Sequence, residues 1–116
     1  MNTEPVTHIT TEVMDGKGKV LTVTCADDTG TPVAPDTMTW SLYNSANEIV
    51  DSREAVSVAS PATSNTILIS GTANSLLVDP DRYRLFIVEW TYTSDAGSGI
   101  PAGDMADYYI VDKTRG

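Results

Sequence analysis

The chain has 116 residues, 41% of them hydrophobic, and carries 16 acidic against 7 basic residues, a formal net charge of −9. This length and apolar content suit one folded domain over residues 1–116, with a single hydrophobic core. Proteins bind nucleic acids and anionic membranes through clusters of Lys and Arg. No such cluster occurs here, so we expect a domain that binds neither nucleic acid nor membrane.

Cys25 is the only cysteine and His8 the only histidine. One cysteine cannot form an internal disulfide, which fits a reducing compartment. The first twenty residues contain Glu4, Glu12 and Asp15 without an apolar run, so no signal peptide is predicted. No segment approaches the roughly 18 apolar residues of a membrane-spanning helix.

The elements expected along the chain are short strands. Their predicted ranges are 6–13, 19–26, 37–43, a return strand beginning at 49–50, 55–59, 65–70, 82–93 and 105–112. Residues 37–43 show the clearest alternation, with Met38, Trp40 and Leu42 on one face. We expect a crossing segment over 71–80, with one helical turn near 74–77, and a mobile hairpin loop from Ser94 through Pro101. The pattern is typical of an all-β sandwich or barrel.

Two features resemble immunoglobulin domains. Residues 77–85 resemble the tyrosine corner, in which a tyrosine, here Tyr83, bonds to backbone upstream. The order Cys25, Trp40, Tyr83 resembles the immunoglobulin core, with Leu85 where a second cysteine would stand. The resemblance implies an immunoglobulin-like β-sandwich of about seven to eight antiparallel strands. The alternative is that Trp40 and Tyr83 are core aromatics of another β fold.

A further resemblance covers residues 21–111. The turn at 27–33, the sequence W-S-L-Y-N from Trp40, E-I-V at 48–50, Y-R-L-F-I-V-E-W-T-Y-T from Tyr83 and Y-Y-I-V at 108–111 resemble immunoglobulin-like modules of phage virion proteins. They are also similar to bacterial surface modules of the invasin type. The first resemblance implies a non-enzymatic structural or assembly protein of a phage particle, in its tail, neck or capsid. Its partners would be other virion proteins or a second copy.

The phage resemblance also implies a location in the virion, with assembly in the bacterial cytoplasm. Compact length and the lack of a secretion signal or tandem repeat favour this interpretation. The alternative is a carbohydrate- or protein-binding immunoglobulin-like module of a bacterial surface protein, in which exposed Trp90 and Tyr92 would stack on sugars.

The sequence offers few groups for catalysis or metal binding, and we expect no enzyme activity, cofactor or metal site. His8 would have to meet its partners in a cleft, and Cys25 lies on an apolar face. Three acidic pairs near turns were considered as calcium ligands: Asp27 with Asp28, Asp79 with Asp81, and Asp104 with Asp107. Aspartates in turns are explained without a metal, because their side chains cap their own backbone.

The longest predicted strand, 82–93, suggests an interface. If Tyr83 points inward, then Leu85, Ile87 and Glu89 do so as well. The opposite face then carries Arg84 and an apolar stripe formed by Phe86, Val88, Trp90 and Tyr92. An exposed stripe of this kind marks a protein interface, and addition of an edge strand to a neighbour is a second way to dock. The alternative is a β-bulge at Val88 and Glu89, which would bury Trp90.

Overall fold

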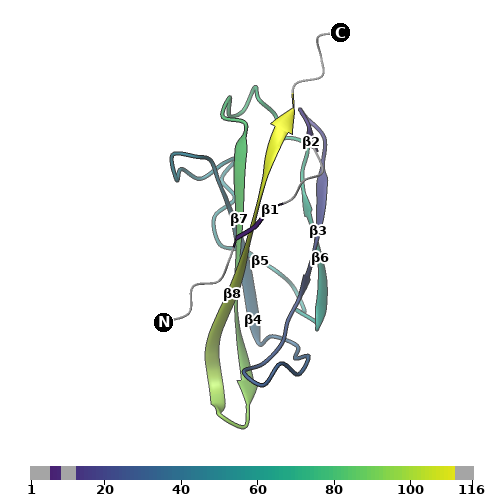
Figure 1. Cartoon of the computed structure of the whole chain (residues 1–116), viewed down its shortest axis with the longest axis vertical. Coiled ribbons are helices and arrows are strands. Elements are labelled where there is room, and N and C mark those ends of the chain that lie inside the picture. The colour runs from purple at the N-terminus through teal and green to yellow at the C-terminus, as the bar shows by residue number, and fades with distance from the viewer. Residues whose placement is uncertain (1–5, 9–12, 112–116) are drawn as a thin grey trace.

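The structure is a computed structural model and describes residues 6–8 and 13–111. Within these residues the chain forms eight strands and no helix, and the strands are labelled in Figure 1. Their bounds are β1 Val6–His8, β2 Val13–Met14, β3 Lys19–Thr24, β4 Thr37–Tyr43, β5 Val56–Ser57, β6 Ser64–Ile69, β7 Tyr83–Ser94 and β8 Gly97–Val111. The all-β prediction is therefore confirmed.

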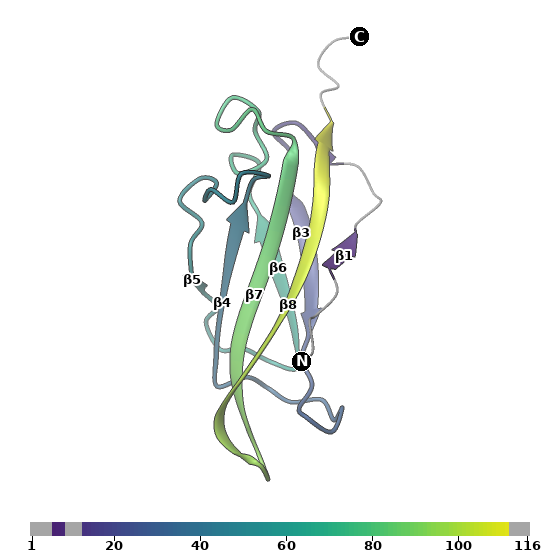
Figure 2. The same cartoon turned by 60° about the vertical axis from the view of Figure 1, so that its left-hand side comes forward.

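The strands form two sheets that face each other (Figures 1 and 2). The large sheet has the order β1-β8-β7-β4-β5, with β2 also paired to β8, and the small sheet consists of β3 and β6. β1 and β2 run parallel to β8, while the other pairs are antiparallel. The prediction that all strands are antiparallel is therefore wrong for β1 and β2.

Alternation along each strand defines the layer between the sheets. In β6 every second residue is buried, and in β3 Leu21 and Val23 are buried while their neighbours are exposed. The resulting core is one cluster of 17 apolar side chains from both sheets. Trp40 of β4 and Phe86 of β7 lie near its centre, with ring centroids 5.6 Å apart. Side chains from two inner faces thus fill one core, as in β-sandwiches.

Strand prediction succeeded where alternation was regular. β4 has the predicted bounds, and β3, β6 and β7 differ from the predicted ranges by one or two residues at their ends. The return strand at 49–50 is reduced to a bridge between Tyr43 and Ile49. Of the first predicted strand, residues 9–12 lie outside the described part. Residues 71–78 form successive tight turns where one helical turn was expected.

The β7–β8 hairpin is the largest departure from the prediction. β8 begins at Gly97, not near Met105, and pairs with β7 down to the contact of Ser94 with Gly97. Gly97 and Gly99 have φ values of 138° and 66°, which glycine adopts without a steric penalty. The expected mobile loop is therefore a long two-stranded arm that projects beyond the two sheets (Figure 2).

Candidate interaction surface

The structure places the predicted interface stripe inside the core. Phe86, Val88, Trp90 and Tyr92 are 2%, 1%, 7% and 4% exposed. The prediction that this stripe is exposed is therefore wrong. The bulge alternative is wrong as well, because β7 pairs with β8 without interruption through Val88 and Glu89 and shifts register only between Tyr92 and Ser94.

The error comes from the orientation assumed for Tyr83. Tyr83, Leu85 and Ile87 are only half-buried and lie on the outer face of the large sheet, with Glu89 exposed beside them. In a strand with period two, one wrong anchor moves every side chain to the opposite face. The correct orientation also explains Glu89, which sequence reasoning had placed inward.

Two of the four residues predicted for the core lie there. Cys25 and Trp40 are buried, 2% and 7% exposed, whereas Tyr83 and Leu85 are not core residues. On β7 the side chain that meets Trp40 is Phe86, adjacent to the residue expected there. The interpretation of Leu85 as the replacement for a second cysteine is therefore wrong.

Tyr83 does not form the expected contact with upstream backbone. Its hydroxyl donates to Asp107 Oδ2 at 2.8 Å, between the adjacent strands β7 and β8. Burial, followed by the hydrogen bond to Asp107 and its negative charge, raises the pKa of Tyr83 to about 12. The ring also packs edge-on against Tyr109, with centroids 5.4 Å apart. Tyr83 thus joins two strands on the outer face.

Arg84 anchors the segment that crosses between the sheets, a role that sequence reasoning missed. Its side chain is fully buried, and Nε donates to Ala73 O at 3.1 Å. The two other nitrogens donate to the backbone carbonyls of Asp79, Asp81 and Tyr83. Burial lowers the pKa of Arg84, and the nearby Asp79 carboxylate opposes this shift. An arginine within an otherwise apolar alternation, just after an aspartate-rich turn, is the signal for such an anchor.

The outer face of the large sheet carries an apolar patch. Leu85 lies between Tyr43 of β4 and Asp107 of β8, and Ile87 lies between Ser41 and Met105. We call the outer patch the set Tyr43, Tyr83, Leu85, Ile87, Met105 and Tyr109. All are half-buried except Tyr109, which is 63% exposed. The outer face of an isolated sandwich is ordinarily polar, so a cluster of this kind is a candidate interface.

A hollow of about 560 Å³ adjoins the outer patch. Its lining combines Tyr83, Leu85 and Tyr109 with the polar residues Asn44, Ser45, Asn47, Asp81 and Arg82. Asp81 accepts hydrogen bonds from the backbone amide and the hydroxyl of Ser45, and these hold the 44–48 turn against the 79–82 turn. The hollow thus has aromatic and hydrogen-bonding walls.

The acidic pairs serve mainly as backbone caps. Asp27 Oδ1 accepts from the amides of Thr29 and Thr31, at 2.9 and 3.0 Å. Asp79 Oδ1 accepts a hydrogen bond from the backbone N–H of Asp81, and Asp81 Oδ1 accepts one from the backbone N–H of Tyr83. Hydrogen bonds lower the pKa of Asp27 and Asp81. Within residues 6–8 and 13–111, no three His, Cys, Asp or Glu side chains gather as metal ligands would.

Asp104 and Asp107 lie on opposite faces of β8. Asp107 is on the outer face beside Leu85, whereas Asp104 is paired with Val88 on the inner face. This pair therefore does not converge on one site.

The two residues considered for nucleophilic chemistry belong to different parts of the fold. His8 belongs to β1, opposite Asp107, and its side chain lies outside the described residues. Cys25 is buried in the core, and burial, followed by the negative charge of Asp104, raises the pKa of its thiol. Because the thiolate is the reactive form, this environment disfavours reaction at Cys25.

Comparison with known proteins returned no matching protein family, curated protein or solved structure. Nor does the described part of the chain contain a helix that could span a bilayer. The function is therefore argued from the surfaces described above.

Proposed function

We propose that the chain is an immunoglobulin-like structural module of a phage particle that acts through protein–protein contacts. Its strand pairing supports the immunoglobulin-like part. In that fold, strands B and E pair in one sheet and strands C, F and G pair in the other. Here β3 pairs with β6, and β4, β7 and β8 are neighbours in that order. Cys25 just after β3 and Trp40 on β4 occupy the corresponding core positions.

The observation that carries the protein-contact part is the outer patch. Leu85 and Ile87 lie at its centre, on the middle strand of the three long strands. Tyrosine and methionine, which surround them here, are favoured in interfaces because their area is large and their polar atoms tolerate partial exposure. The resemblance of residues 27–50, 83–93 and 108–111 to phage virion modules supports the assignment to a phage particle.

Particle incorporation tests this proposal directly. Particles released by the strain whose genome encodes the chain are purified on a density gradient, and the chain is sought in them by mass spectrometry and immunogold labelling. We expect the chain in intact particles. Its presence in cells together with its absence from purified particles would contradict the phage assignment.

Paired substitutions test the surface itself. Leu85→Arg places a charge in the centre of the outer patch, and we expect loss of incorporation with folding retained. Leu68→Arg is the matched control, because Leu68 is 62% exposed on the outer face of the small sheet. Equal incorporation of both variants would show that the outer patch is not the contact surface.

Carbohydrate binding is a second candidate, favoured by the hollow beside Tyr83 and Tyr109. The platforms expected for it, Trp90 and Tyr92, are buried and cannot stack on a sugar. The exposed Tyr109 ring beside the polar lining of Asn44 and Arg82 offers stacking and hydrogen bonding together. A glycan array tests this candidate, with Tyr109→Ala as the matched variant. A silent array for the unsubstituted chain would reject it.

A further inference from the structure

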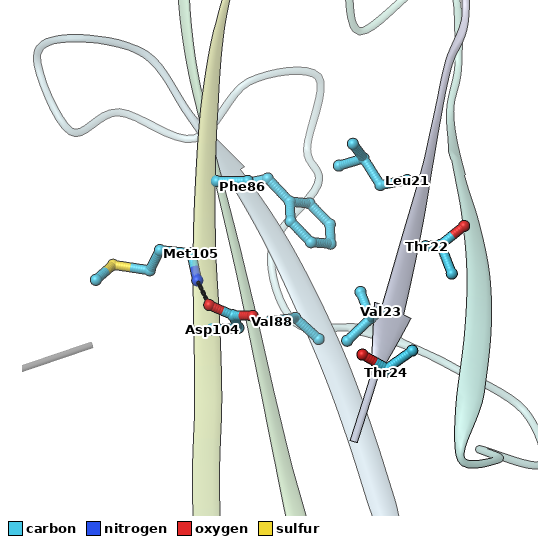
Figure 3. A pocket seen from close by; sticks show the side chains of 9 residues that line it. Leu21, Thr22, Val23, Thr24, Phe86, Val88, Asp104 and Met105 are labelled. Carbon is cyan, nitrogen blue, oxygen red and sulfur yellow. Dashed lines mark hydrogen bonds between the residues drawn. The ribbon is translucent and has the colours of Figure 1, made fainter. Parts of the chain in front are cut away.

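The sandwich is open along one seam between its sheets. β6 covers only one edge of β3, and no described strand pairs with the other. Because the Cys25 amide donates to Thr63 O, the odd-numbered residues of β3 bond toward β6. Val20, Thr22 and Thr24 therefore direct their backbone N–H and C=O groups toward the free edge. In Figure 3, Leu21 and Val23 of β3 point across the seam toward β7 and β8.

Two adjoining cavities lie in the seam. One, of about 250 Å³, is walled by Leu21 and Val23 on one side and by Phe86 and Val88 on the other (Figure 3). The second, of about 370 Å³, continues from Thr24 and Asp104 along Trp90, Tyr92 and Ala102. Together they form a channel beside an unpaired strand edge, apolar where Leu21, Val23, Phe86 and Val88 line it. This is the geometry of β-strand addition.

The side chains on the inner face of β8 do not fill this channel. Phe86, Val88 and Trp90 of β7 lie opposite Ala106, Asp104 and Ala102 of β8. Two alanines fill much less volume than the large apolar residues usual at inner positions. The third residue, Asp104, is exposed although its neighbour Val88 is 1% exposed. A carboxylate thus stands on a core-facing position at the mouth of the channel.

Trp90 supplies an independent sign of a missing partner. Its side chain lines the second cavity and is 7% exposed, and the buried Nε1–H has no hydrogen-bond acceptor among the described residues. A buried donor without an acceptor is costly, by roughly the desolvation of one polar group. The ring that carries this donor forms part of the wall against which an occupant of the channel would pack.

Charge indicates the chemistry of the occupant. The described lining of the two cavities includes Asp27 and Asp104 and no basic side chain. A segment carrying Lys or Arg at its centre would pair with Asp104, whereas an acidic one would be repelled. The apolar walls on both sides favour apolar residues at the flanking inward positions.

We propose that the seam binds an extended segment of a partner protein, added to the free edge of β3, with a basic residue between two apolar residues on its inward face. The backbone of Thr22 and Thr24 holds the segment, its apolar side chains fill the two cavities, and its basic side chain reaches Asp104. This site is separate from the outer patch, and its proposal does not depend on the chain being part of a phage particle.

Titration with designed peptides tests the proposal. The probe is a seven-residue capped peptide with threonine at odd positions and valine, lysine and valine at positions two, four and six. The comparison peptide has glutamate in place of lysine. Binding to the ¹⁵N-labelled full chain is followed by NMR. We expect shifts at the amides of Thr22 and Thr24 and at the indole N–H of Trp90, with the lysine peptide about tenfold tighter.

Two variants locate the contact. Asp104→Asn is expected to reduce the preference for lysine to about threefold, while Glu89→Gln, the same charge change on the outer face, leaves it unchanged. Ala106→Leu fills the first cavity and is expected to weaken binding of the lysine peptide by about tenfold or more. A folded spectrum of Ala106→Leu shows that this loss is local.

Four outcomes would overturn the proposal. They are absence of binding at millimolar peptide, equal binding of the two peptides, shifts confined to the outer patch, and retention of full binding by Ala106→Leu. Two further controls address other occupants. If deletion of residues 1–5 newly exposes the Thr22 and Thr24 amides to exchange, the chain occupies its own seam. If Ala106→Leu dissociates a dimer detected by sedimentation, a second copy occupies it. Either result would also reject a partner segment.

Discussion

Tyr83 and Asp107 are joined across β7 and β8 by a hydrogen bond of 2.8 Å from the phenol to the carboxylate. The pKa of Tyr83 is about 12, above its ordinary value of 10.0, so the folded state favours the protonated phenol. This contribution to stability is complete below pH 10 and is lost as the pH rises toward 12.

Tyr83→Phe tests this linkage. At pH 7 we expect the variant to be less stable by about 1 kcal/mol, because it lacks the hydrogen bond. The difference should shrink between pH 10 and 12, since the unsubstituted chain loses the same contribution there. Urea denaturation at several pH values measures this difference in the free energy of unfolding. Tyr109→Phe is the control, and a difference for Tyr83→Phe that stays constant through pH 12 would contradict the assignment.

Arg84→Met should be strongly destabilising. The substitution keeps much of the side-chain volume but leaves the buried carbonyl of Ala73 and the partly buried carbonyls of Asp79 and Asp81 without their donor. We expect a loss of about 3 kcal/mol or more in the free energy of unfolding. The exposed neighbour supplies the control, because Arg82→Met should change stability by less than about 0.5 kcal/mol. Equal effects of the two substitutions would refute the anchoring role.

Trp90 should act as a core residue in stability measurements. Trp90→Ala leaves a large cavity and is expected to cost about 3–5 kcal/mol. Trp90→Phe retains most of the apolar contact and removes an N–H that has no acceptor within the described residues, so its cost should be about 1–2 kcal/mol. Thermal and urea denaturation distinguish them. A small effect of Trp90→Ala would restore the exposed-stripe interpretation that the structure contradicts.

Cys25 should resist thiol reagents in the folded chain. It is 2% exposed, and its thiol pKa is raised by burial and by Asp104. We expect labelling at pH 8 to be at least about a hundredfold slower in buffer than in denaturing urea, because reaction requires opening of the core. The Cys25→Ser variant gives the background rate. Comparable rates in buffer and urea would show that the thiol is accessible.

Strand positions were largely predictable because alternation of polar and apolar residues is a local property. Thr37–Tyr43 follows from such alternation alone, whereas the strand predicted at 65–70 was inferred from its apolar run Ile67, Leu68 and Ile69. The length of β8 was not predictable, since Gly97, Gly99 and Pro101 signal a loop by composition. Pairing with β7 overrides that local preference, because Pro101 and Ile100 pair with Thr91 and Tyr92 and the hairpin closes at Ser94 and Gly97.

The candidate sites were less predictable than the strands, because their residues come together only across strands. The sequence by itself determined that the chain is all-β, acidic and rich in short alternating strands, and that Cys25 and Trp40 lie on apolar faces. Only the tertiary structure decided which face of β7 is inside. Period-two alternation is symmetric between the faces, and the choice depends on whether Tyr83 or Arg84 is buried. Arg84 is buried because carbonyls of the folded segment that precedes β7 satisfy its guanidinium, whereas Tyr83 lies outside with Leu85 and Ile87.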